Sequence, residues 1–171
     1  MDIVVEDGTG LPTANSYCSA DDADDLLSQN MYATAWLSLT DDQKENLLIY
    51  ASTLIDMRTK WTGHKAHHSS GLSWPRWHVR DKEGCLVEDN IVPKQVKLAT
   101  ATLANFILTN GADPEELDSS NNLKELKVDV IMLQFDPNIL KNKYPNSVKW
   151  MIEPLGWVSM GRGGPKYIVR H

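Results

Sequence analysis

The chain has 171 residues and a hydrophobic content of 42%, enough for a single domain, residues 1–171, with its own core. Its formal net charge of −6 argues against the basic footprint of a typical nucleic-acid-binding domain. No apolar run approaches the roughly eighteen residues that a membrane-spanning helix needs, and we expect no membrane partner. The first ten residues lack the basic and apolar regions of a signal peptide.

The charges are divided between the two ends of the chain. Residues 1–30 contain seven acidic residues and no Lys or Arg, whereas residues 141–171 contain six basic residues and one acidic residue, Glu153. One interpretation is two solvated ends with an accidental bias. The other is that the two ends meet on neighbouring copies, as in a ring with heterologous contacts.

Capping signals predict three helices. The first begins at Ser19, which precedes acidic residues in the first turn; the second begins at the capping box 40–43 and runs to about Lys60. The third begins at Pro93 and ends at Asn110 before a glycine.

The C-terminal third is expected to be less regular. Residues 126–135 are rich in β-branched and large apolar side chains and predict one strand. Pro145 predicts the start of a short helix that Pro154 ends. The glycine-rich residues 156–171 predict a flexible tail.

A long connection separates the second and third helices. Residues 64–92 exceed the usual two to eight or so residues of a helix connection, which predicts an arm. Within it, 77–80 and 86–88 would pair as a hairpin around the turn 81–84, with Gly84 in a left-handed conformation. The fold class predicted is mainly α: a small helical bundle with an inserted β-hairpin or arm and minor C-terminal β elements.

The residues that could carry chemistry do not form a catalytic pattern. His64, His67 and His68 are the candidate metal cluster, but they lie in a loop without a convincing further ligand. Cys18 and Cys85 form no CxxC pair and are expected to be thiols rather than a disulfide. With no nucleophile elbow and no phosphate-binding loop, we expect no enzyme, no cofactor and no specific metal site.

One stretch interleaves aromatic rings with positive charge, as a single-strand stacking platform does: Trp74, Arg76, Trp77, His78 and Arg80. Acidic residues at 81, 83, 88 and 89 follow it and would repel a phosphate backbone. The competing interpretation, which we favour, buries both tryptophans against the bundle or a partner subunit.

Five motifs arrive in order over most of residues 3–110. They are V-E-D-G-T-G-L at 5–11 with Ser16-Tyr17; D-x-R-x-x-W-x-G at Asp56, Arg58, Trp61 and Gly63; L-x-W-P-R at Leu72, Trp74, Pro75 and Arg76; D-x-x-G at Asp81 and Gly84; and a helix start at Ile91-Val92-Pro93 with Val96, Ala99 and Leu103. This order resembles the tailed-phage head–tail connector (adaptor) proteins that are often labelled DnaT-like ssDNA-binding. An extra residue, Val92, departs from the Ile-Pro pair of that family, and the C-terminal third is a looser match.

The resemblance implies a structural virion protein of the phage neck, assembled in the host cytoplasm. Copies would form a homo-oligomeric ring, often a dodecamer, under the portal protein. The ring would join the capsid to a tail terminator, stopper or tail-tube protein and let packaged double-stranded DNA pass. The expected interface residues are Trp61, Trp74, Pro75, Arg76, Trp77, Asp81 and Gly84.

The alternative hypothesis is a single-stranded DNA-binding replication accessory protein. The acidic composition, the lack of an OB-type series of strands and the acid-flanked basic stretch argue against it. It predicts binding that weakens steeply with salt and tryptophan fluorescence that an oligonucleotide quenches.

Overall fold

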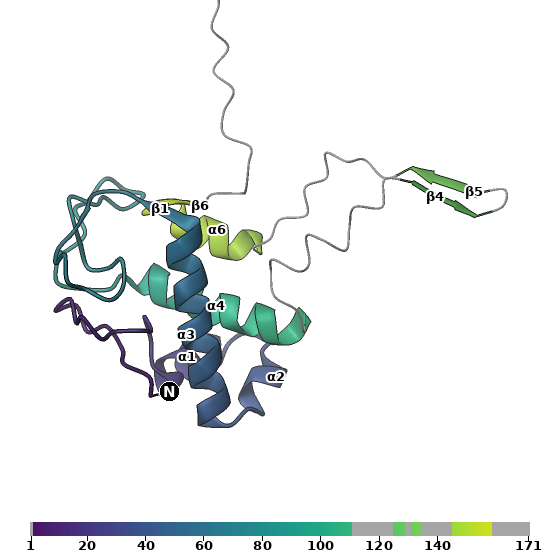
Figure 1. Ribbon diagram of the computed structural model, residues 1–171, viewed down its shortest axis with the longest axis horizontal. Coiled ribbons are helices and arrows are strands. Elements are labelled where there is room, and N and C mark those ends of the chain that lie inside the picture. Colours follow the sequence, from purple (N-terminus) through teal and green to yellow (C-terminus); the bar gives the residue numbers. More distant parts are fainter. Residues whose placement is uncertain (1, 111–124, 129–130, 135–144, 159–171) are drawn as a thin grey trace, which may run out of the picture.

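The computed structural model describes residues 2–110, 125–128, 131–134 and 145–158. These residues form five helices and six short strands (Figure 1). The helices are α1 (Ala20–Leu27), α2 (Thr34–Leu37), α3 (Asp41–Arg58), α4 (Lys94–Asn110) and α6 (Asn146–Ile152). The strands are β1 (Thr59–Trp61), β2 (His64–Lys65), β3 (Arg76–Trp77), β4 (Glu125–Val128), β5 (Ile131–Gln134) and β6 (Gly156–Val158). The prediction of a mainly α protein is confirmed.

The helix starts follow the capping chemistry of the sequence. The Ser19 hydroxyl accepts a hydrogen bond from the Asp22 backbone N–H at 3.0 Å, and the Gln43 side chain accepts from the Thr40 N–H at 3.1 Å. Helix α3 ends at Arg58, two residues earlier than predicted, because the backbone becomes extended at Thr59 to enter β1. The short helix α2 was not predicted; its N-terminus has no side-chain cap.

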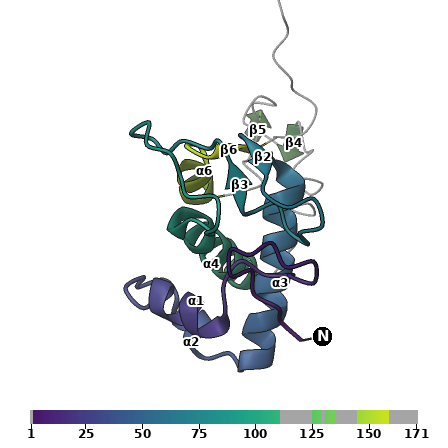
Figure 2. The ribbon, with the colours of Figure 1, turned by 90° about the vertical axis from the view of Figure 1, so that its left-hand side faces the viewer.

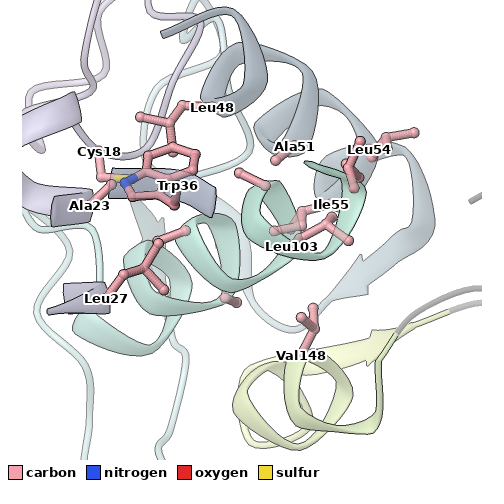
Figure 3. Close-up of a cluster of buried hydrophobic side chains, with 14 of the residues drawn as sticks. Cys18, Ala23, Leu27, Trp36, Leu48, Ala51, Leu54, Ile55, Leu103 and Val148 are labelled. Carbon is pink, nitrogen blue, oxygen red and sulfur yellow. The ribbon is translucent and has the colours of Figure 1, made fainter. Parts of the chain in front are cut away.

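The long helices α3 and α4 cross at the centre, and the shorter ones cover their ends. Helices α1 and α2 pack at one end and α6 at the other (Figures 1 and 2). The main hydrophobic core fills the space between them, with Trp36 beside Leu48 near α1, and Leu103 and Ile55 toward Val148 of α6 (Figure 3). Apolar burial on this scale provides most of the folding free energy of such a domain.

An ion pair closes the end of this core at α1. The Asp24 carboxylate accepts from Trp36 Nε1 and from Lys44 Nζ, each at 2.7 Å. The Lys44 side chain is only 7% exposed, so the ion pair provides the charge partner that burial requires. It ties α1 to α2 and α3.

The six strands form three two-stranded antiparallel sheets, β1 with β6, β2 with β3 and β4 with β5. The first joins segments that are distant in the sequence. In the first, β1 pairs with β6 in the register Thr59↔Val158, Lys60↔Trp157 and Trp61↔Gly156. The prediction of a flexible tail from residue 156 is therefore wrong for 156–158, and 159–171 lie outside the described residues.

Strands β4 and β5 lie where one strand was predicted. They pair antiparallel from Glu125↔Gln134 to Val128↔Ile131, so the single strand over 126–135 is corrected to two. The β-branched residues signalled extended backbone correctly, but their run did not reveal the break between the two strands.

The predicted arm, 64–92, forms part of a second hydrophobic core. Trp74 and Val79 pack against Tyr17, Val96 of α4 and Leu155, so most of this connection lies on the body of the protein. Strand β2 pairs with β3. At the tip, the expected hairpin pairing consists of one bridge, between Arg80 and Leu86. None of the described helices is long and apolar enough to span a membrane.

Replacing Leu103 by Ala is expected to lower the free energy of unfolding by about 2–5 kcal/mol, because a fully buried side chain between α3 and α4 leaves a cavity. Denaturant titration measures the loss. Met57→Ala is the matched control: Met57 is 71% exposed, and its removal is expected to cost less than about 0.5 kcal/mol. Equal losses would contradict this view of the core.

Candidate nucleic-acid interface

The Asp56 carboxylate, at the last turn of α3, lies at the centre of the motif-bearing residues. Its Oδ1 accepts from the Tyr17 hydroxyl at 2.5 Å and from Trp61 Nε1 at 3.1 Å, and its Oδ2 accepts from the Ser73 N–H at 2.8 Å. The three donors come from the N-terminal segment, β1 and the long connection. Asp56 thereby fixes the positions of three segments that are distant in sequence.

Burial governs the titration of this group of side chains. Burial raises the pKa of Asp56, although the hydrogen bonds from Tyr17, Ser73 and Trp61 oppose it. Burial, and then the negative charge of Asp56, raise the pKa of Tyr17 well above its ordinary value. The Tyr17 hydroxyl therefore remains a donor to Asp56 at neutral pH.

Arg76 holds the connection together from inside. Its guanidinium donates to the backbone carbonyls of Thr62 at 2.7 Å, Gly63 at 2.9 Å and Ser73 at 3.1 Å. Burial lowers the Arg76 pKa, while the negative charge of the nearby Asp56 opposes this. With its donors committed to these carbonyls, the side chain is a structural brace.

The predicted interface residues are divided between core and surface. Trp74 is fully buried beside Trp61, with ring centroids 5.7 Å apart in an edge-to-face arrangement, and a cis peptide bond joins it to the buried Pro75. Trp77 is 48% exposed. The turn beyond it has Gly84 at φ +84° and the Asp81 carboxylate accepting from the backbone N–H groups of residues 83 and 85. The structure therefore brings the partly buried Trp61 together with the buried Trp74, Pro75 and Arg76, and leaves Trp77 and the turn outside.

The stacking platform suggested by residues 74–80 does not form as a surface. Trp74 and Arg76 are buried, and Arg80 donates to the Gly84 carbonyl oxygen. Trp77, His78 and Arg80 remain exposed, but without Trp74 and Arg76 they are too few for a continuous aromatic and basic track.

The candidate metal ligands are not gathered either. The His67 ring lies over Gly10, where an added Cβ would come within 2.4 Å of it. Among the described residues, no group of three or more His, Cys, Asp or Glu side chains is placed to hold a metal ion. Both cysteines are free thiols, and burial raises the pKa of Cys18 to about 12.

A different surface combines exposed aromatic rings with positive charge. Trp150 of α6 is 68% exposed and Trp157 of β6 is 55% exposed. The two tryptophans line one hollow together with Lys149. Across the β1–β6 ladder, the Lys60 ammonium lies over the Trp157 ring, 5.1 Å from its centroid. We call Lys60, Lys149, Trp150 and Trp157 the Trp150–Trp157 surface.

Sequence reasoning missed this surface. Lys60 is about ninety residues from Lys149 in the chain, and only the unpredicted pairing of β1 with β6 brings it to Trp157. A signal was nevertheless present. In the short segment after Pro145, the apolar positions that pack inward are Val148 and Ile152, so Trp150 falls on the opposite face of a helix.

The whole chain, residues 1–171, matches the protein family described as "Putative DnaT-like ssDNA binding protein". The chain belongs to this family. No curated protein and no solved structure matches it.

The family match corrects the functional prediction. The interpretation as a head–tail connector of a phage virion is wrong, because the family that the whole chain matches is described by single-stranded DNA binding. The alternative hypothesis of the sequence analysis agrees with that description. Of what the resemblance implied, the DnaT-like label agrees with the family match.

Replacing Asp56 by Asn is expected to lower the free energy of unfolding by about 1–3 kcal/mol at neutral pH. The carboxylate accepts through both oxygens, whereas an amide has one acceptor oxygen, so either the Ser73 N–H or the Tyr17 and Trp61 donors lose their acceptor. The loss is expected to grow as the pH falls. Because the Asp56 pKa is raised in the folded state, the folded native protein takes up a proton at a pH where its unfolded chain does not. Its free energy of unfolding therefore rises as the pH falls through that pKa. The Asp56→Asn variant has no carboxyl group at this position and lacks this gain.

Denaturant titrations from pH 7 downward measure this difference. Asp89→Asn, at an exposed position of the connection, is the control and is expected to change the free energy of unfolding by less than about 0.5 kcal/mol. If the loss of unfolding free energy in Asp56→Asn becomes smaller as the pH falls, the Asp56 pKa is not raised in the folded protein, and the prediction is wrong.

Proposed function

We propose that this protein binds single-stranded DNA as a replication accessory, with the Trp150–Trp157 surface as its contact site. The observation that carries the proposal is the pair of tryptophans, more than half exposed, beside two lysines. Folding of the chain gains nothing in stability from exposing two indole rings, so their exposure favours a contact function. The family description supports the nucleic-acid class.

Stacking explains why this arrangement fits single strands. The bases of a single strand have free π-faces, and each base stacked on an aromatic side chain contributes about 1–3 kcal/mol. Duplex bases are stacked on each other and do not offer these faces. Lys60 and Lys149 would add attraction for phosphates next to the stacked bases.

The acidic residues of α1 do not oppose binding at this place. The four aspartates of α1 lie at the end of the molecule opposite to α6 and β6 (Figure 1). Helix α3, with 18 residues, spans about 27 Å between these ends. This is several times the Debye length of about 8 Å at physiological salt, so the aspartate field is largely screened at the Trp150–Trp157 surface.

Removal of either exposed ring is expected to weaken binding to an oligothymidylate by about 5- to 150-fold, since each loses one stacking contact. Trp150→Ala and Trp157→Ala are the variants, and fluorescence anisotropy of a labelled strand at low salt is the measurement. Trp77→Ala is the matched control, because Trp77 is similarly exposed but lies on β3. Its affinity is expected to stay within twofold of the native value.

Two outcomes would contradict this assignment. Native protein that binds no single strand at low salt would remove the proposed function. Loss of binding in Trp77→Ala but in neither of the other variants would move the contact site to the connection between α3 and α4.

Lys60→Gln tests the charge contribution separately. If Lys60 neutralises one phosphate, the slope of log affinity against log salt concentration is expected to become shallower by about 0.7. Lys94→Gln is the control, an exposed lysine at the start of α4. Titrations at four or more salt concentrations measure both slopes, and equal slopes for Lys60→Gln and the native protein would exclude a phosphate contact at Lys60.

A further inference from the structure

The Trp150–Trp157 surface contains a hollow of about 170 Å³. It is lined by Lys149, Trp150 and Glu153 of the α6 segment and by Trp157 and Val158 of β6. A cavity of about 150 Å³ is known to hold a benzene ring, so the hollow has the size for one planar aromatic group. It is smaller than the roughly 300–1,000 Å³ pockets that take drug-sized ligands.

Glu153 is the acidic side chain among these lining residues. It is exposed, and within the described part of the chain its carboxylate has no hydrogen-bond or ion-pair partner. Its backbone N–H donates to the Lys149 carbonyl oxygen at 2.8 Å, which holds the residue at the C-terminal end of α6. An ionised carboxylate only accepts hydrogen bonds, so an occupant of the hollow that bonds to Glu153 in place of water must donate them.

The four DNA bases differ in what they offer a carboxylate. Guanine has two adjacent donors on its Watson–Crick edge, the ring N1–H and the exocyclic N2–H, which match the two oxygens of a carboxylate. Adenine and cytosine each place a ring acceptor beside their single amino group, and thymine flanks its one N–H with two carbonyls. A carboxylate would meet lone-pair repulsion from each of these three.

We propose that the hollow takes one guanine base of a single strand, with Glu153 accepting from N1–H and N2–H. The tryptophans would stack on the base, and Lys149 on the same rim would attract the neighbouring phosphate. The assignment rests on the proposed function and adds a base preference to a surface that would otherwise bind any single strand. It makes Glu153 the specificity-determining residue.

The experiment compares an oligothymidylate with the same strand carrying one central guanine, by fluorescence anisotropy. The native protein is expected to bind the guanine strand at least about fivefold more tightly, because one paired hydrogen-bond contact typically discriminates by about 5- to 150-fold. Inosine at the same position lacks the N2 amine, and it is expected to lose most of this gain. This comparison needs no variant.

Glu153→Gln is expected to reduce the guanine preference to less than twofold, measured as the ratio of the affinities for the guanine strand and the oligothymidylate. Glu83→Gln, at the exposed turn beyond β3, is the matched control and should keep the preference. Equal native affinity for the guanine and thymine strands would overturn the inference and leave the proposed function intact. So would a preference that persists in Glu153→Gln. Absence of binding to every strand would overturn the proposed function itself.

Discussion

A buried carboxylate needs donors, and the requirement of Asp56 organises one end of this protein. The Tyr17 hydroxyl, Trp61 Nε1 and the Ser73 N–H all converge on it at the end of α3. Leaving such a group unsatisfied costs several kcal/mol, so the three segments are held together by one group. Because Trp61 is the last residue of β1, the same contact sets the direction of that strand.

The direction of β1 in turn determines the surface that we propose for DNA. Strand β6 pairs with β1, and their register places Lys60 opposite Trp157. Gly156 fits there because an added Cβ would come within 2.8 Å of the Lys60 carbonyl oxygen. The exposed indole of Trp157 is therefore presented by close backbone packing and positioned by a cation above its ring.

The sequence predicted best what local chemistry determines. Caps at Ser19 and Thr40 and the turn glycine at 84 act within a few residues, and the structure has them where the sequence placed them. The pairing of β1 with β6 depends on residues nearly a hundred positions apart, and no local pattern encodes it. The candidate site consists of residues brought together by that pairing, so a search for contiguous aromatic and basic residues selected the stretch at 74–80 instead.

The motif residues and the contact residues are thus different sets. Trp74 and Arg76 looked functional because a large ring and a cation are typical of binding sites, yet one packs in a core and the other braces carbonyls. Exposing the indole of Trp74 would leave a large apolar surface in water, so its place in a core explains its presence without a ligand. The three carbonyls that Arg76 bonds explain the arginine in the same way. Trp150 and Trp157 have no such explanation, since folding leaves both rings largely in solvent. Exposure after folding, rather than residue type, therefore separates Trp150 and Trp157 from Trp74 and Arg76. The lysines beside the exposed pair distinguish it from Trp77, and for this reason the proposed binding surface is on α6 and β6.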